Sequence, residues 1–258
     1  MKKNTVIKKA ALSVALGSVL IASQASADTL LGVYVGGDGW RSDVTGRFGN
    51  SEPAPVFNFD SKTQGSYFIA LEHPIPVLPN IRLAHNQLEA EGVSLIDAQF
   101  SFGGENFTVN TSVANRVDLT NTDIILYYEF LDNSVIELDI GVNGKHIKGS
   151  ASVVEQTQNG LQGEESVSQW LPLVYVNSKI GLPLTGLDVF AQGSYIGWSD
   201  SRMYDVQAGV AYEIIDSLAV DIRLKVGYRA VNLRMDDIDN LYSNLDFKGA
   251  FAGIELHF

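Results

Sequence analysis

The 258-residue sequence contains no cysteine. This absence excludes disulfide scaffolds, thiolate metal sites and cysteine nucleophiles. The sequence also lacks the run of roughly 18 apolar residues that a membrane-spanning helix needs, which excludes a helical membrane protein. Its 24 glycines and 7 prolines are too few for a collagen-like or a disordered chain.

Basic residues are also scarce. Lys and Arg number 18 against 30 Asp and Glu, and the formal net charge is −12. This balance argues against a basic nucleic-acid-binding face, so we expect no nucleic-acid partner. The residues suggest no cofactor site either, because no P-loop, H-E-x-x-H or G-x-S-x-G motif occurs.

The N-terminus has the pattern of an export signal. Lys2, Lys3, Lys8 and Lys9 precede an apolar stretch over 10–22, and a small-residue site follows at Ala25-Ser26-Ala27. We therefore expect a signal peptide over 1–27 with cleavage near Ala27, and a single domain over 28–258. An uncleaved anchor is disfavoured because the apolar stretch is short. Cleavage removes lysines and no acidic residue, so the mature chain is more acidic than the whole.

The mature chain repeats with a period of two. Between Leu218 and Ala230 every second residue is apolar or aromatic, and the residues between them include Asp221, Arg223 and Lys225. The segments 204–214, 136–142 and 187–195 alternate in the same way. Successive strand residues point to opposite faces, so each segment presents one apolar and one polar face. A tilted strand needs about 9 to 11 residues to cross a bilayer, and several of these segments are that long.

Turn signals divide the chain into hairpins. Short breaks occur at 76–80, 131–133, 181–186 and 216–217, and longer polar connections lie near 42–62, 91–117, 150–166, 199–202 and 235–243. The strands expected between them are 29–40, 63–73, 81–90, 118–130, 134–149, 167–180, 187–198, 203–214, 217–233 and 244–258. An even strand count with short turns at one end is typical of an outer-membrane barrel whose short turns face the periplasm.

The fold prediction is all-β: a closed antiparallel transmembrane β-barrel of about ten strands, with eight or twelve as alternatives. The count depends on the connection 91–117, which alternates around Gly103-Gly104. This connection could form an extended hairpin above the membrane, fold into the barrel as a partial plug, or add two short strands. A lipocalin-like barrel or a β-sandwich also fits alternation alone.

Aromatic positions favour the membrane barrel. One expected band lies near the short turns and another near the long loops, as at the two interfaces of a bilayer. The first band consists of Tyr128, Phe130, Tyr212 and Phe258, and the second of Tyr67, Trp170, Tyr195, Tyr204 and Tyr228.

The last strand resembles the C-terminal assembly signal of outer-membrane barrels, with Ile254, Leu256 and Phe258 at alternate positions up to the terminus. The Gly36-Gly37 pair and the hairpin from Leu71-Glu72-His73-Pro74 to Leu83 are similar to a small family of Gram-negative outer-membrane barrel proteins named for its Gly-Gly pair. This resemblance implies the cell outer membrane as location. It also implies outer-membrane lipid, lipopolysaccharide and the barrel-assembly machinery as partners, and it assigns no site residue or surface ligand.

Function must then come from the lumen or the loops. The inward-facing acids are expected to be Glu72, Glu129, Glu137, Asp139, Asp188, Asp205, Glu213, Asp221 and Glu255, and the inward-facing bases Arg82, Lys145, Lys179, Arg223, Lys225 and Arg229. Isolated buried charges cost several kcal/mol each, so these groups should pair and largely close the lumen. Asp205 should lie diagonal to Lys225 and Arg229. The expected charge network comprises Glu129, Glu137, Asp139, Lys179, Asp205, Asp221, Arg223, Lys225 and Arg229.

Two groups of residues could suggest an enzyme. The turn after Leu131 should place Glu129 nearly opposite Glu137, with Asp139 close by, but this carboxylate group lies at the periplasmic end and has Lys179 as a counterion. The ten-stranded omptin proteases use Asp pairs and an Asp-His pair at the outer rim. Here only His146 is suitably placed, and no acidic motif accompanies it. We therefore expect no enzyme, with an omptin-like hydrolase at the rim as the remaining catalytic alternative.

The loops give weaker signals. The acidic tip Asp236-Asp237-Ile238-Asp239-Asn240 could hold a divalent cation through oxygen ligands, although it lacks the glycine and distant glutamate of an EF-hand. The sequence thus predicts a structural or narrow-channel barrel. Surface binding by the loops, or transport of a small solute, is the alternative.

Overall fold

The computed structural model describes residues 31–133, 135–217, 219–238 and 241–258, and this part of the chain is built from strands. Within the same residues no helix is long and apolar enough to cross a membrane. The strands are β1 (Gly32–Gly49), β2 (Val56–Asn58), β3 (Lys62–Glu72), β4 (Asn80–Asn86), β5 (Glu89–Leu95), β6 (Phe100–Phe102), β7 (Glu105–Phe107), β8 (Ser112–Asp118), β9 (Asn121–Asp132), β10 (Ile136–Glu155), β11 (Gln162–Leu182), β12 (Leu187–Trp198), β13 (Ser201–Ile215), β14 (Asp221–Ile238) and β15 (Leu241–His257).

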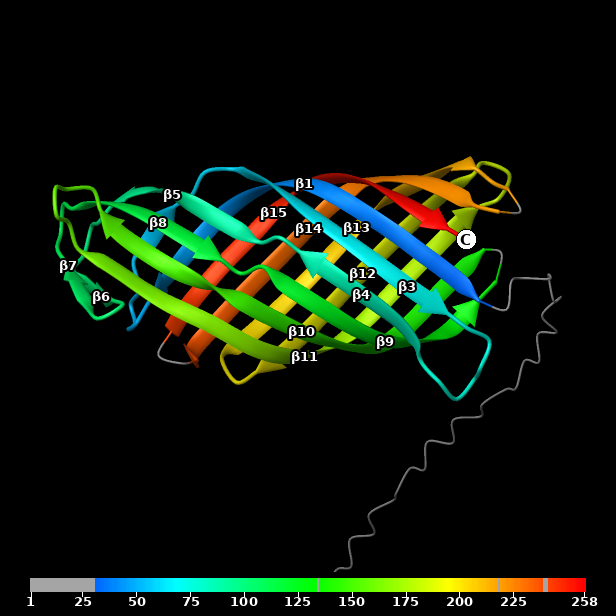
Figure 1. Ribbon diagram of the computed structural model, residues 1–258, viewed down its shortest axis with the longest axis horizontal. Coiled ribbons are helices and arrows are strands. Elements are labelled where there is room, and N and C mark those ends of the chain that lie inside the picture. The colour runs from blue at the N-terminus through cyan, green and yellow to red at the C-terminus, as the bar shows by residue number, and fades with distance from the viewer. Residues whose placement is uncertain (1–30, 134, 218, 239–240) are drawn as a thin grey trace, which may run out of the picture.

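Ten strands close into one antiparallel barrel (Figure 1). Around the ring they follow the order β1, β3, β4, β9, β10, β11, β12, β13, β14 and β15. β15 pairs with β1 over almost its whole length, from Tyr34 opposite His257 to Gly49 opposite Tyr242, and this pairing closes the wall. The prediction of a closed ten-stranded barrel is confirmed, and the alternatives of eight or twelve strands are wrong.

Short turns join β3 to β4, β9 to β10, β11 to β12 and β13 to β14. All four lie at the end of the barrel that also holds the C-terminus (Figure 1). The short turns predicted from the sequence lie in these same four connections. We call this the turn end, and the opposite end, which carries β6 and β7, the outer end.

At the outer end the strands continue further than the sequence analysis expects. β10 runs to Glu155 and β11 begins at Gln162, whereas the expected strands stop at 149 and begin at 167. Beyond the aromatic band the outward side chains become polar, as at Lys148 and Ser150, and the inward ones become apolar, as at Ala151 and Val153. The alternation of polar and apolar residues continues here, but the polar residues now face outward and the apolar ones inward. Because of this reversal, the sequence pattern does not reveal where the strands end.

The connection 91–117 adds no strand to the ring of ten but forms an extended hairpin at the outer end. Its tip, β6–β7, also packs Phe102 and Phe107 into the outer lumen as a partial plug. β5 continues β4 and β8 continues β9, so both raise the wall at the outer end. β6 and β7 form a separate two-stranded sheet at the outer tip (Figure 1). Gly103 and Gly104 join these two strands with φ of 58° and 80°, a left-handed conformation that suits a tight hairpin turn and favours glycine.

The outer surface carries the expected aromatic residues. Phe130 and Tyr212 are exposed near the turn end, and Trp170, Tyr195 and Tyr228 are exposed towards the outer end. Tyr204 is half-buried. Exposed aliphatic side chains such as Val142 and Val226 cover the zone between the bands. Two aromatic bands around an aliphatic zone are the surface that a bilayer favours.

A cluster of ion pairs lies where the outer surface of the barrel wall changes from apolar to polar. Lys62 Nζ lies 2.8 Å from Glu89 Oε2 and 3.3 Å from Glu91 Oε1, and Arg116 lies 3.6 Å from Glu89. The hydrogen bond to Glu89 raises the pKa of Lys62, with a smaller contribution from Glu91. Such a partly exposed cluster belongs to the part of the wall beyond the hydrocarbon.

Candidate functional site: the barrel lumen

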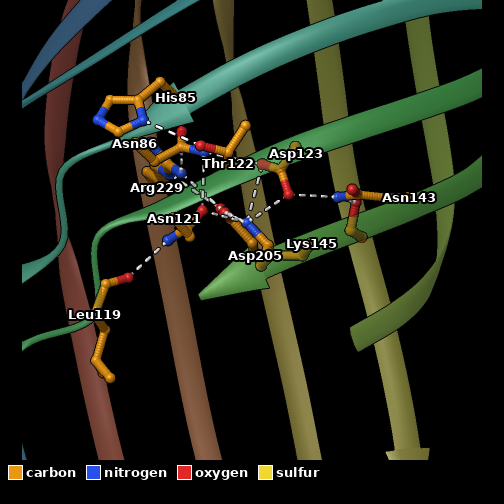
Figure 2. Close-up of polar contacts among 11 residues, drawn as sticks. His85, Asn86, Leu119, Asn121, Thr122, Asp123, Asn143, Lys145, Asp205 and Arg229 are labelled. Atoms are coloured by element: carbon orange, nitrogen blue, oxygen red, sulfur yellow. Dashed lines mark hydrogen bonds and ion pairs between the residues drawn. The ribbon is translucent and has the colours of Figure 1, made fainter. Parts of the chain in front are cut away.

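A layer of polar side chains crosses the middle of the lumen. We call it the cross-lumen network, and its members come from β4, β9, β10, β13 and β14: Asn86, Asn121, Asp123, Asn143, Lys145, Asp205 and Arg229 (Figure 2). β9 and β10 lie on the side of the ring opposite β14 and β15. Contacts among these residues therefore run from one wall to the other.

Asp205 is the centre of this layer. Its two carboxylate oxygens accept hydrogen bonds from Arg229 Nε at 2.9 Å and Arg229 Nη2 at 2.8 Å, which is a bidentate pair. Lys145 Nζ donates to Asp205 Oδ2 at 3.3 Å. One carboxylate on β13 thus holds cations from β10 and β14.

Lys145 is fully buried, and a second carboxylate neutralises it. Its Nζ lies 2.9 Å from Asp123 Oδ1, and it also donates to Asn121 Oδ1 at 2.9 Å. Asn86 bridges the two halves of the layer, because it donates to Asp123 at 2.9 Å and accepts from Arg229 at 3.0 Å. Buried charges are tolerated when they are paired and hydrogen-bonded in this way.

A second set of ion pairs lies between this layer and the turn end. Lys179 pairs with Glu137, and Arg223 donates to Glu213 at 3.0 Å. Lys225 Nζ lies 3.4 Å from Glu255 Oε2 and 3.6 Å from Asp38 Oδ1. Three of these ion pairs join neighbouring strands, and the pair of Lys225 with Asp38 joins β14 to β1 across β15.

The remaining members of the expected network occupy the turn end as well. Asp139 accepts a hydrogen bond from Asn177 at 2.9 Å, and Glu129 accepts one from Asn80 at 3.2 Å. Asp221 lies 3.2 Å from His257 Nδ1 at the rim.

A stacked cation fills the space between the two polar layers. The Arg82 guanidinium lies 3.3 Å from the centre of the Phe68 ring, and Lys225 Nζ lies 5.1 Å from it. Gly36 lets this ring approach the wall, because a Cβ at Gly36 would lie 2.5 Å from Phe68 Cε1 and 2.8 Å from the Ile254 carbonyl oxygen. The first glycine of the Gly-Gly pair therefore has a packing role.

Apolar side chains fill most of the lumen above the cross-lumen network. Trp40, Phe48, Phe102, Phe107 and Phe247 are among the largest fully buried side chains. The β6–β7 hairpin contributes to this cluster, since the Phe102 ring packs edge-on against Phe48 with centroids 5.2 Å apart. Most of the outer half of the lumen is thus a hydrophobic core that the sequence analysis did not predict.

Two features of the expected geometry are wrong. Glu129 lies opposite Asp139 and not Glu137, because a bulge shifts the β9–β10 register between Leu138 and Asp139. The ion-pair partners of Lys225 are Glu255 and Asp38, whereas Asp205 pairs with Lys145 and Arg229.

Two lumen acids, Asp38 and Asp123, are absent from the set expected from the sequence. Asp123 lies six residues before Glu129 on β9, which is three alternations of two residues, so its inward direction follows from the pattern used for Glu129.

Space within the polar part of the lumen is small. One cavity of about 50 Å³ adjoins the cross-lumen network, and another of about 70 Å³ lies among the turn-end ion pairs. A single water needs about 10 to 15 Å³ of such volume, so each cavity holds only a few waters.

His146 lies on the outside of the barrel. Its ring stacks on Trp170 with centroids 4.6 Å apart and an angle of 11°, within the outer aromatic band. Within the described residues no group of three or more His, Asp or Glu side chains is placed to hold a metal ion. Residues 239–240 of the acidic tip, and the signal peptide over 1–27, lie outside the described residues.

No protein-family model and no curated protein matches the chain. Solved structures do match. The outer membrane protease OmpT from Escherichia coli is 11% identical with a TM-score of 0.51, and the match covers 90% of this chain and 99% of that chain. The transport unit of the autotransporter AIDA-I from Escherichia coli is 9% identical with a TM-score of 0.41, covering 92% of this chain and 93% of that chain. At 11% identity the likeness to OmpT concerns the fold alone: a closed outer-membrane-type β-barrel.

Proposed function

We propose that the chain is an integral outer-membrane protein with a structural role and a closed lumen, which leaves at most a narrow water path. The observation that carries this proposal is the cross-lumen network, in which Asp123, Lys145, Asp205 and Arg229 join opposite walls. The apolar core above it closes most of the outer half of the lumen. A solute would have to break both layers to pass.

The outer surface supports the membrane location. Its aromatic bands and aliphatic zone suit contact with outer-membrane lipid and, at the outer end, with lipopolysaccharide. Ile254, Leu256 and Phe258 lie on or directly after β15, the strand that closes the ring, where the barrel-assembly machinery would read them. Export by the N-terminal signal completes this proposal.

A non-enzymatic role fits the geometry best. The cations of the cross-lumen network are held in ion pairs, Asp139 and Glu129 accept hydrogen bonds from Asn177 and Asn80, and His146 faces away from the lumen. A rim-located hydrolase would need an acid and a base converging on an open cleft.

Liposome swelling tests the closed lumen. Proteoliposomes with the refolded protein should swell in isotonic arabinose no faster than empty liposomes, because the cavities hold only a few waters. A sixteen-stranded porin gives the open reference, and heat-modifiable gel migration verifies that the reconstituted protein is folded. Swelling at a porin-like rate by folded protein would contradict the proposal.

A further inference from the structure

One part of the outer lumen is not filled. A cavity of about 510 Å³ lies beside β10–β14 at the outer end, and we call it the outer recess. Its apolar lining includes Ile147, Val167, Leu171, Ile196, Met203 and Leu233. The volume lies within the range of about 300 to 1,000 Å³ that is usual for small-molecule sites.

The recess exists because the wall is low at β12 and β13. β12 ends at Trp198 and β13 begins at Ser201, while β10 and β11 continue well beyond that level to Glu155 and Gln162. The β11–β12 ladder begins only at Val174 opposite Tyr195, two residues after Pro172, which has no N–H to donate. The upper part of β11 thus pairs with β10, and the recess opens above the β12–β13 turn.

The opening lies next to the outer aromatic band. Trp170 and Tyr195 belong to that band, and Trp198, three residues beyond Tyr195, is 80% exposed at the lip of the recess. An apolar cavity beside the membrane interface is reached most readily by the hydrocarbon chain of an amphiphile. Met203 and Met235 in the lining can adapt to such a chain, because methionine side chains are flexible.

Two arginines stand together at the same lip. Arg202 lies directly opposite Arg234 in the β13–β14 ladder, and both exposed side chains have the outward parity, whereas the next pair, Met203 and Leu233, faces inward. Both arginines border the recess from the outer side of its low rim. Arg202 Nε donates to Asn232 Oδ1 at 3.2 Å, and Asp200 and Asp236 also border the recess. Like charges directly opposite each other on a sheet are unfavourable, and an anion between them would relieve the repulsion.

We propose that the outer recess binds a single-chain anionic amphiphile of the fatty-acid type. Its alkyl chain occupies the apolar cavity, and its carboxylate lies on Arg202 and Arg234. This site lies above the cross-lumen network and does not depend on whether the lumen below conducts.

Single-thiol protection tests the position of the chain, because the protein has no cysteine of its own. Ile196→Cys puts a thiol in the recess, and Thr185→Cys puts one in an exposed turn at the opposite end as the matched control. In lipid nanodiscs, saturating dodecanoate should slow maleimide labelling of the recess thiol at least about tenfold and change the control by less than about twofold. Equal effects on both thiols, or no effect on the recess thiol, would overturn the proposal.

A charge variant tests the head group. In the Ile196→Cys protein, Arg202→Gln with Arg234→Gln should raise the dodecanoate concentration for half-protection about tenfold or more, since charge-assisted hydrogen bonds are lost. Dodecanol, which has the same chain without the charge, should protect only weakly and should be insensitive to the arginine changes. Equal protection by dodecanol and dodecanoate would overturn the anionic assignment. Heat-modifiable migration verifies folding of each variant.

Discussion

Asp205→Ala is expected to lower the free energy of unfolding by about 3 to 5 kcal/mol, the usual cost of removing one partner from a buried ion pair. Arg229 would lose its bidentate acceptor, and Lys145 would keep only Asp123 as a counterion. Both cations are buried, so water cannot replace the lost carboxylate without opening the layer. Urea unfolding of the protein in lipid vesicles, followed by tryptophan fluorescence, measures the loss.

Asp246→Ala is the matched control for this measurement. Asp246 pairs with Lys248 at 3.3 Å, but the side chains are 29% and 48% exposed. Such a pair contributes at most about 1 kcal/mol. The double variant Asp205→Ala, Arg229→Met should recover part of the loss, because it removes the uncompensated charge as well. A cost for Asp205→Ala no larger than that for Asp246→Ala would show that the layer is not a buried ion-pair network.

Phe247→Ala should destabilise the protein by a similar amount, about 3 to 5 kcal/mol, through the transfer and cavity terms of a buried aromatic side chain. Phe247 is on β15, is fully buried and belongs to the apolar core of the outer half. The same urea unfolding measures the effect.

Phe247→Leu is the control, since it keeps most of the apolar volume and should cost less than about 1.5 kcal/mol. If the outer half were a water-filled vestibule, the alanine variant would cost little. Equal stability of the alanine variant and the wild-type protein would therefore contradict the apolar core.

The strands within the membrane zone could be predicted because one rule applies there. Between the aromatic bands the outward residue of each pair meets lipid and the inward one meets polar groups, as at Val226 beside Lys225. Turn residues such as Leu131-Asp132-Asn133 then locate the hairpins. Together these signals predict the strand number and most of the pairing.

Beyond the outer band the same rule misleads. On β15, Asp246 and Lys248 face outward while Leu245 and Phe247 face inward, the reverse of the pattern nearer the terminus. Water outside and packing inside cause the reversal, and period alone does not reveal it. The polarity pattern therefore predicts loops for the upper parts of β10 and β11 and gives no sign of the apolar core.

The pairing within the lumen was predictable only in part. The expected diagonal contact between Asp205 and Arg229 follows from strand register, and the structure places the two side chains 2.8 Å apart. The contact between Lys145 and Asp205 joins β10 to β13 across the lumen. Such contacts depend on the closure and tilt of the whole ring, and no local pattern encodes them.

Single-channel recording in planar lipid bilayers tests the closed lumen most directly. The folded wild-type protein in molar KCl should show no stable open state and at most a small conductance, because the cross-lumen network and the apolar core lie in series. A large and stable ohmic conductance from folded protein, comparable to that of a porin, would contradict the account.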